Sequence, residues 1–94
     1  MARVTIRREV WERGKLELVP RSQLKQALRG LERDPAKGKP LGRNLKGCRS
    51  IRIGGSENRL VYRLLENDVV EVLAIGRRRD QDAHQIAELR QAEH

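Results

Sequence analysis

The stretch RSIRIGGSENRLVYR, residues 49–63, decides how this chain folds. Ile51 and Ile53 flank an arginine, and the run NRLVYRLL (58–65) continues the alternation of apolar and charged side chains. A period of two is typical of β-strands, and the four residues GGSE (54–57) between the runs suit a hairpin turn. We therefore predict two antiparallel strands, over 50–53 and 58–65.

A third strand is predicted immediately downstream, over DVVEVLAIG (68–76). Its nearly continuous apolar run is typical of a central strand, which is covered on both faces. The short segment END (66–68) is a turn of hairpin length, so the three strands form an antiparallel meander.

The alternation assigns side chains to the two faces of this sheet. One face is apolar and is expected to pack on a helix; it carries Leu60, Tyr62 and Leu64. The other face is expected to carry Arg52, Arg59 and Arg63.

Upstream of the meander, apolar spacing predicts a helix over 22–32. Ser22 is its candidate N-cap, and Asp34-Pro35 ends it. The pattern at 3–7 predicts a half-buried strand, whereas 9–19 fits either a helix or a hairpin that turns at Gly14.

A short last helix is predicted over 80–91, with Asp80 as its N-cap. The predicted fold is α+β: a small antiparallel sheet of about four strands, mixed at its edge, packed on one or two N-terminal helices. With 94 residues the chain forms one domain, 1–94.

The chain is strongly basic, with a formal charge of +8, which favours an anionic partner. The excess lies in residues 1–50, where 14 Lys/Arg face 5 Asp/Glu; residues 51–94 hold 7 against 8. A solvated helix face is the alternative explanation. The single cysteine, Cys48, excludes an internal disulfide and a cysteine-based zinc site, and a small buried thiol is expected there.

Nothing in the sequence resembles a signal peptide or a membrane span, so we expect a cytoplasmic protein that does not act at the membrane. The segment 36–47 is expected to be an irregular loop. It is either a flexible surface loop or a contact for nucleic-acid phosphates, and the two interpretations are compatible. The candidate RNA contacts of the chain are Lys37, Lys39, Arg43, Lys46, Arg49 and Arg77.

The run GRRRDQDAH (76–84) follows the last predicted strand and adds Arg78 and His84 to the arginines of the sheet. Arginine suits a bidentate grip on phosphate, and histidine transfers protons near neutral pH. Together these residues predict a site that cleaves RNA without a metal or another cofactor.

The arginines also have a structural interpretation. Arg63 fits a cross-strand pair with Glu71. Arg77 and Arg79 fit solvated positions or ion pairs with the aspartates of 80–82.

The same holds for the aromatic residues and the histidine. His84 fits a surface position as well as it fits a catalytic one. We expect Tyr62 to lie in the core, and Trp11 in the core or at a partner contact.

The ordered motifs LERDP, KPLGRNLKG, CRSIRI, NRLVYRL and VVEVLAIGRRRDQDAH resemble the RelE/ParE superfamily of bacterial type II toxins, over about residues 22–84. This resemblance implies a RelE-like fold and favours a helix over 9–19. RelE-like members cut mRNA in the ribosomal decoding site. Carried over by position, the catalytic residues would be Arg52, Arg59, Arg78 and His84. Ser50 stands where many members have lysine, and serine is a poor general base.

The resemblance also implies partners: a cognate antitoxin, and the ribosome with its mRNA. Two alternatives stay open. One is a ParE-like inhibitor of DNA gyrase, whose branch generally lacks the catalytic residues. The other is an inactive member that only binds.

Overall fold

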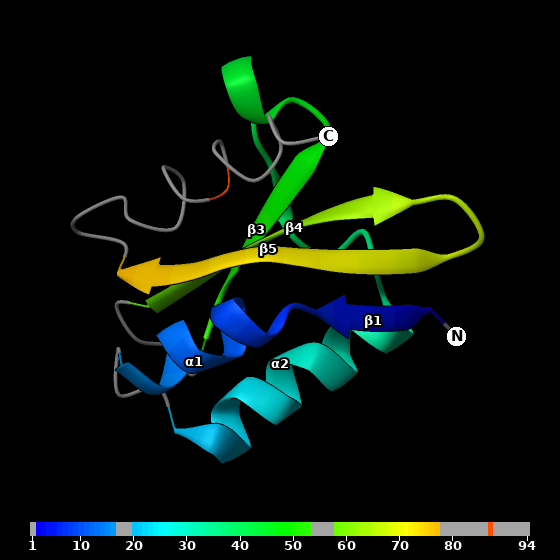
Figure 1. Ribbon diagram of the computed structural model, residues 1–94. Helices are drawn as coiled ribbons and strands as arrows, with labels where there is room; N and C mark the ends of the chain where they lie inside the picture. The colour runs from blue at the N-terminus through cyan, green and yellow to red at the C-terminus, as the bar shows by residue number, and fades with distance from the viewer. Residues whose placement is uncertain (1, 17–19, 54–57, 78–86, 88–94) are drawn as a thin grey trace.

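The computed structural model describes residues 2–16, 20–53, 58–77 and 87 of this 94-residue chain. A five-stranded sheet with the order β1-β5-β4-β3-β2 forms its centre. Helices α1 (Arg8–Leu16) and α2 (Arg21–Arg33) lie together on one side of this sheet (Figure 1). The predicted α+β class is confirmed.

The meander is confirmed: β3 (Cys48–Arg52), β4 (Asn58–Leu65) and β5 (Val69–Arg77) pair antiparallel in sequence order. The turn between β4 and β5 places Asn67 and Asp68 at φ 62° and 58°. Asn and Asp tolerate this left-handed region better than other residues with a Cβ, so the local sequence suits the hairpin.

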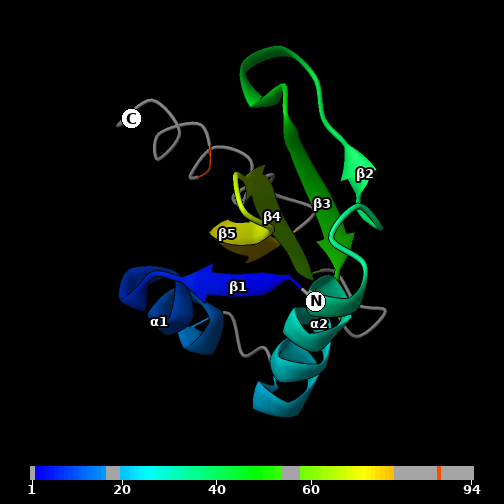
Figure 2. The ribbon, with the colours of Figure 1, turned by 90° about the vertical axis from the view of Figure 1, so that its right-hand side faces the viewer.

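The strand predicted at 3–7 is β1 (Arg3–Ile6), which pairs parallel with β5 and makes the edge mixed (Figure 2). The segment 9–19, open between helix and hairpin, is helical as α1 over its described part.

The second helix matches its predicted range, but the predicted N-cap is wrong. Pro20 is the N-cap residue of α2, without a side-chain capping bond, and Ser22 lies inside the first turn. The ring of Pro20 fixes the backbone φ angle at the start of the helix. Proline has no side-chain oxygen, so no side-chain capping bond forms there.

The segment 36–47 is more ordered than the sequence predicts. It contains the short strand β2 (Lys39–Pro40), paired with β3, and the 3-10 turn η1 (Arg43–Leu45). Leu45 is buried, and this explains the order: a leucine anchored under the turn offsets the conformational entropy that a free loop would keep. The helix predicted over 80–91 lies outside the described residues except for Ala87.

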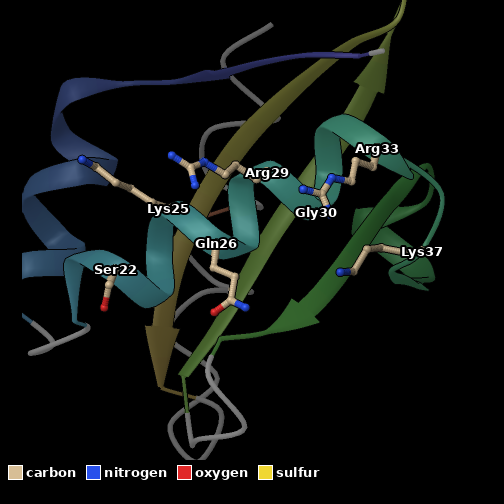
Figure 3. A pocket seen from close by; sticks show the side chains of 7 residues that line it. All are labelled: Ser22, Lys25, Gln26, Arg29, Gly30, Arg33 and Lys37. Atoms are coloured by element: carbon tan, nitrogen blue, oxygen red, sulfur yellow. The ribbon is translucent and has the colours of Figure 1, made fainter.

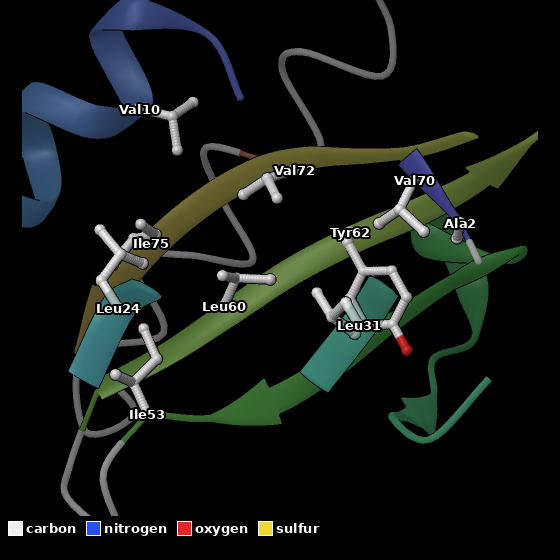
Figure 4. Packing of buried hydrophobic residues seen from close by; sticks show 10 residues of the cluster. All are labelled: Ala2, Val10, Leu24, Leu31, Ile53, Leu60, Tyr62, Val70, Val72 and Ile75. Atoms are coloured by element: carbon white, nitrogen blue, oxygen red, sulfur yellow. The ribbon is translucent and has the colours of Figure 1, made fainter. Parts of the chain in front are cut away.

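The main core fills the space between the helices and one face of the sheet, here called the first face. Leu60 and Tyr62 of β4 are fully buried there with Leu24 and Leu31 of α2, as Figure 4 shows. Trp11 is half-buried against this core, as predicted.

The expectation for the apolar face is wrong at one position. Leu64 is 44% exposed, because it lies near the end of β4, beyond the last buried residue of that strand.

The opposite face, here called the second face, carries a smaller core. Its buried members are Leu45, Cys48, Val61, Leu73, Ala74 and Ala87. The register of β4 and β5 shifts by one residue at Val61/Tyr62, so Val61 faces Ala74 while Tyr62 faces Val72. Leu73 is the extra residue of this bulge, and it joins Ala74 in the second core.

In the described part of the chain, neither helix is long and apolar enough to cross a membrane.

Candidate functional site

Two arginines face each other at one end of the second face. The register of β3 and β4 sets Arg52 directly opposite Arg59, and β5 places Gly76 on the other side of Arg59. Arg52 is exposed and Arg59 half-buried. Like charges directly opposite each other are unfavourable in an antiparallel pair, and this register sets two of them in that position. The backbone register thus places two arginines on adjacent strands at this end of the sheet.

Arg63 lies four residues further along the same strand and forms the cross-strand pair with Glu71 that the sequence allowed. Its Nε donates to Oε1 of Glu71 at 2.7 Å, and the two residues are register partners on β4 and β5. Each side chain is 16% exposed, so solvent screens this ion pair weakly. The pair neutralises Arg63, which separates it from Arg52 and Arg59.

The three arginines share the predicted face, but they do not form one exposed charged surface. Between Arg59 and Arg63, Val61 is fully buried in the second core. The alternation placed these side chains on one face correctly, but η1 and Ala87 bring apolar groups over its middle. The arginines of β3 and β4 that face solvent are confined to its end.

Two residues of the second face are poor candidates for chemistry. Cys48 is buried, as predicted, and burial raises the pKa of its thiol while nearby Arg63 opposes the shift. Ser50, directly opposite Val61, is also buried, with only 8% of its surface exposed. A neutral buried thiol and a buried hydroxyl give the site no ready nucleophile or base.

Arg49 points away from this face and holds the turn that follows α2. Its guanidinium Nη1 donates to the carbonyl oxygens of Gly38 and Ala36, at 2.8 and 3.2 Å. Arg49 is therefore engaged with the backbone of its own fold, although the sequence suggested an RNA contact.

Tyr62 reaches the same turn from the main core. Its hydroxyl donates to the Pro35 carbonyl at 2.7 Å and accepts from the Gly38 N–H at 3.0 Å. Burial raises the pKa of the Tyr62 phenol, so it stays a donor. The bonds of Tyr62 and Arg49 lie on both sides of Lys37 and fix its position.

Lys37 belongs to a basic hollow on the outer side of α2. The hollow has a volume of about 630 Å³ and is lined by Ser22, Lys25, Gln26, Arg29, Gly30, Arg33 and Lys37. Figure 3 shows the basic side chains following one another along the helix, with Lys37 facing them from the adjoining turn. We call this surface the α2 hollow.

A smaller hollow of about 280 Å³ adjoins the α2 hollow and is lined by Gln23, Gln26, Ala27, Lys37 and Arg52. The two hollows share Gln26 and Lys37. Arg52 therefore lies beside α2 as well as opposite Arg59, and it links the end of the sheet to the helix.

The other predicted RNA contacts come from four different segments of the chain. Lys39 on β2 and Lys46 before β3 are exposed. Arg43 lies in η1, and Arg77 is the last residue of β5.

Two predicted catalytic residues, Arg78 and His84, lie outside the described residues. Of the predicted catalytic set, the structure therefore places Arg52 and Arg59 only.

Sequence reasoning missed three cations, Lys25, Arg29 and Arg33, because it treated α2 only as a core helix. The signal was present. The three residues are spaced by four, which puts them in one row along the helix. The only acid within α2, Glu32, stands outside that spacing.

A family model for the ParE toxin of type II toxin-antitoxin systems, parDE, matches residues 20–82. That is about two thirds of the chain, and it includes α2 and the whole meander. The chain belongs to the ParE toxin family of type II toxin-antitoxin systems.

Solved structures agree with this assignment. A free-state mutant of the toxin RelE from E. coli has a TM-score of 0.74 at 24% identity, covering 96% of this toxin and 98% of that chain. A chain of the toxin-antitoxin complex RelBE2 from Mycobacterium tuberculosis has a TM-score of 0.60 at 30% identity, over 82% and 98%. A YoeB/ParE toxin from Agrobacterium tumefaciens has a TM-score of 0.62 at 21% identity, over 80% and 97%. No curated protein matches the sequence. The toxin therefore has the fold of the RelE/ParE superfamily.

Proposed function

We propose that this toxin is a ribosome-dependent mRNA endoribonuclease that blocks translation. The observation that carries the proposal is the Arg52–Arg59 pair, which sets two arginines opposite each other on adjacent strands at one end of the sheet. The strand beside it, β5, ends at Arg77, and Arg78 follows directly in the sequence. Arginine suits a phosphodiester substrate because its guanidinium group can bind two phosphate oxygens at once.

The proposed reaction is a transfer within the RNA strand. The ribose 2′-oxygen attacks the adjacent phosphorus, the bond from phosphorus to the 5′-oxygen breaks, and a cyclic phosphate and a 5′-hydroxyl result. Arg59 and Arg78 stabilise the charge that builds on the phosphoryl oxygens, and Arg52 orients the backbone. His84 transfers a proton as general acid or base. Ser50 is too buried to be the base that removes the 2′-proton.

The composition supports a substrate that the ribosome presents. The chain has one Trp, one Tyr and no Phe, and Tyr62 is buried while Trp11 packs against the core. Proteins that grip single strands unaided stack bases on exposed aromatic rings. A toxin without such rings needs mRNA that is already held in place, which puts its action in the cytoplasm.

A cognate antitoxin is the proposed protein partner. Similar structures include the intact RelBE toxin-antitoxin complex of E. coli and a YoeB-YefM complex from Staphylococcus aureus. The basic surface of this toxin suits an acidic segment of such a partner, with association that is fast at low salt.

Inhibition of DNA gyrase is the second candidate function. The description of the matching family as parDE toxins favours it. A gyrase inhibitor would not need the Arg52–Arg59 pair or His84 for RNA chemistry, so the two functions make opposite predictions for variants of these residues.

The test is controlled expression without antitoxin, with growth recorded and cuts on a translated message mapped by primer extension. We expect cuts in register with the reading frame, reduced by about 10²-fold or more in His84→Ala and in Arg59→Ala. Arg8→Ala, which removes an exposed cation on α1, is the matched control and should cut normally.

Circular dichroism must show that each variant is folded. Growth arrest that persists in all variants without RNA cuts, together with loss of DNA supercoiling by purified gyrase, would replace the nuclease by the gyrase inhibitor.

A further inference from the structure

The α2 hollow combines positive charge with a lack of compensating acids. Four of its seven lining residues are cations, and none is a carboxylate. Within the described part of the chain, no ion pair joins these four cations to an acidic side chain. Elsewhere the fold does neutralise an arginine, as Glu71 does for Arg63. The hollow therefore keeps a positive potential that an anion would lower.

Several independent contacts hold the backbone turn that carries Lys37. Tyr62 and Arg49 fix the turn on both sides of it, through the backbone of 35–38. Gly38 is packed closely, because a Cβ there would lie 2.9 Å from the Ser50 carbonyl oxygen. The turn that carries Lys37 is thus anchored to the sheet.

Gly30 completes the arrangement from the helix side. A Cβ at position 30 would lie 2.7 Å from Nζ of Lys37, so the missing side chain lets the ammonium group lie against α2. Glycine inside a helix costs roughly 0.5–1 kcal/mol relative to alanine. Gly30 therefore lowers the stability of α2 at the position where Lys37 lies against the helix.

The lining indicates which kind of anion fits. Protein partners bind through buried apolar and aromatic anchors, and the α2 hollow has no apolar side chain in its lining. Surfaces that bind nucleic acid are polar and positive, and Ser and Gln commonly add hydrogen bonds to phosphate oxygens. Ser22 and Gln26 provide such groups beside the cations.

The geometry favours a backbone of regular shape. Lys25, Arg29 and Arg33 recur every four residues, which advances each cation by about 6 Å along a helix. A straight row of charges matches a rigid row of phosphates better than a flexible single strand, which proteins grip with exposed aromatic rings that this chain lacks.

We propose that the α2 hollow binds the phosphodiester backbone of a double-stranded nucleic acid, without reading its sequence. The site lies on the helix side of the sheet, so binding there does not depend on the cleavage proposed for the second face. Arg52 joins the two surfaces through the smaller hollow, which lets one folded RNA contact both.

The experiment measures binding of the full-length toxin to a labelled 2′-O-methyl RNA duplex, which offers no 2′-hydroxyl to attack. Fluorescence anisotropy is recorded across salt concentrations. Each phosphate contact contributes about −0.9 to the slope of log affinity against log salt. The double variant Arg29→Gln/Arg33→Gln should therefore flatten the slope by about 2 and weaken binding about tenfold at low salt.

The control is Arg3→Gln/Arg8→Gln, which removes the same charge from exposed positions on β1 and α1. The control should keep the slope within about 0.5 of the wild type. Because the 2′-O-methyl duplex cannot be cut, binding is measured separately from cleavage, and failure of the nuclease proposal would leave this one standing.

Parallel arms use a DNA duplex of the same sequence and an acidic peptide. Equal loss for both duplexes supports recognition of phosphate alone, and loss for one duplex assigns the site to that nucleic acid. Equal weakening in the two double variants would overturn the proposal, because any two charges would then suffice. Binding of the peptide but of neither duplex would overturn it in favour of an acidic protein.

Discussion

The two faces of the sheet use the same strands for different purposes. Among the described residues, ten buried side chains form the core on the first face, where α1 and α2 cover the strands, and six form the core on the second face. In this part of the chain, Leu41, η1 and Ala87 pack over the middle of the second face, and its end carries Arg52 and Arg59. The first face therefore stabilises the fold, whereas the second divides its area between packing and charge.

The arginines of the second face also divide between packing and charge. Arg63 and Arg59 share a strand and a face, yet Arg63 has Glu71 as its register partner on one side while Arg59 has Arg52. An arginine held by a carboxylate beside it is part of the scaffold, whereas arginines on adjacent strands can bind one phosphate between them. The count of arginines in the sequence does not distinguish the two cases.

The largest expected effect tests the first face. Leu60→Ala removes a fully buried side chain and should lower the free energy of unfolding by about 2–5 kcal/mol. Leu64→Ala, the same substitution four residues along the same strand, is the control. Leu64 is 44% exposed, so its loss should cost less than about 1 kcal/mol. Urea unfolding followed by circular dichroism measures both, and equal costs would mean that the core extends to the strand end.

A smaller effect tests the ion pair of the second face. Glu71→Gln leaves Arg63 without its charged partner in a weakly hydrated position, and should cost about 2–3 kcal/mol in the free energy of unfolding. Glu66→Gln, in the exposed turn beyond β4, is the control and should change stability by less than about 0.5 kcal/mol. Urea unfolding again provides the measurement, and an equal effect of the two changes would mean that the pair contributes nothing to the fold.

A second variant separates this structural role from chemistry. Replacing both partners, Arg63→Met/Glu71→Leu, should recover part of the lost stability because no buried charge stays unpaired. RNA cutting by this double variant, measured where it is folded, should match the wild type. A large loss of cutting at full stability would put Arg63 in the active site after all.

Local patterns predicted the elements of this fold well. Alternation over 50–65 and the apolar run at 68–76 indicated three strands in the right order, and the spacing of leucines indicated α2. These signals are local, since a side-chain period depends only on the backbone of its own segment. The helix α1 was ambiguous because KLELV alternates while Val10 and Trp11 fit a helical stripe.

Features that depend on distant segments were not predictable. A bulge in the pairing of β4 with β5 directs Leu73 toward the second core. The sequence of neither strand predicts this bulge by itself. Leu45 is buried in a cluster whose other members, among them Val61 and Cys48, come from distant parts of the sequence. Leu64 was assigned to the core by alternation, which continues past the point where the covered part of the strand ends.

The candidate site shows the same limit. The sequence pointed to Arg52 and Arg59, but only the pairing of β3 with β4 shows that they are opposite each other. The proximity of Arg52 to α2 and Lys37 likewise depends on segments that are distant in the sequence. The missed cations of α2 lie in one row that the sequence already contains. Only the structure shows that Lys37 lies next to this row, beside Gly30, and that the four cations line one hollow.

The smallest effect tests how the first face supports the turn that carries Lys37. Tyr62→Phe keeps an aromatic ring in the core but removes the bonds to Pro35 and Gly38. The loss should cost about 1–2 kcal/mol in the free energy of unfolding at neutral pH, measured by urea unfolding. An unchanged free energy would mean that the contacts of Arg49 are sufficient to hold the turn.

The same variant should also change the response to alkali. Burial raises the pKa of the Tyr62 phenol, so above about pH 10 the unfolded chain loses this proton before the folded chain does. The stabilising contribution is therefore complete below that pH and is lost as the pH rises through the folded pKa. From pH 9 to about pH 12, the toxin with Tyr62 should lose stability more steeply than Tyr62→Phe. Both proteins carry Cys48→Ala, because the raised pKa of that thiol acts in the same direction. Parallel declines would mean that the phenol is as well hydrated in the folded toxin as in the unfolded chain.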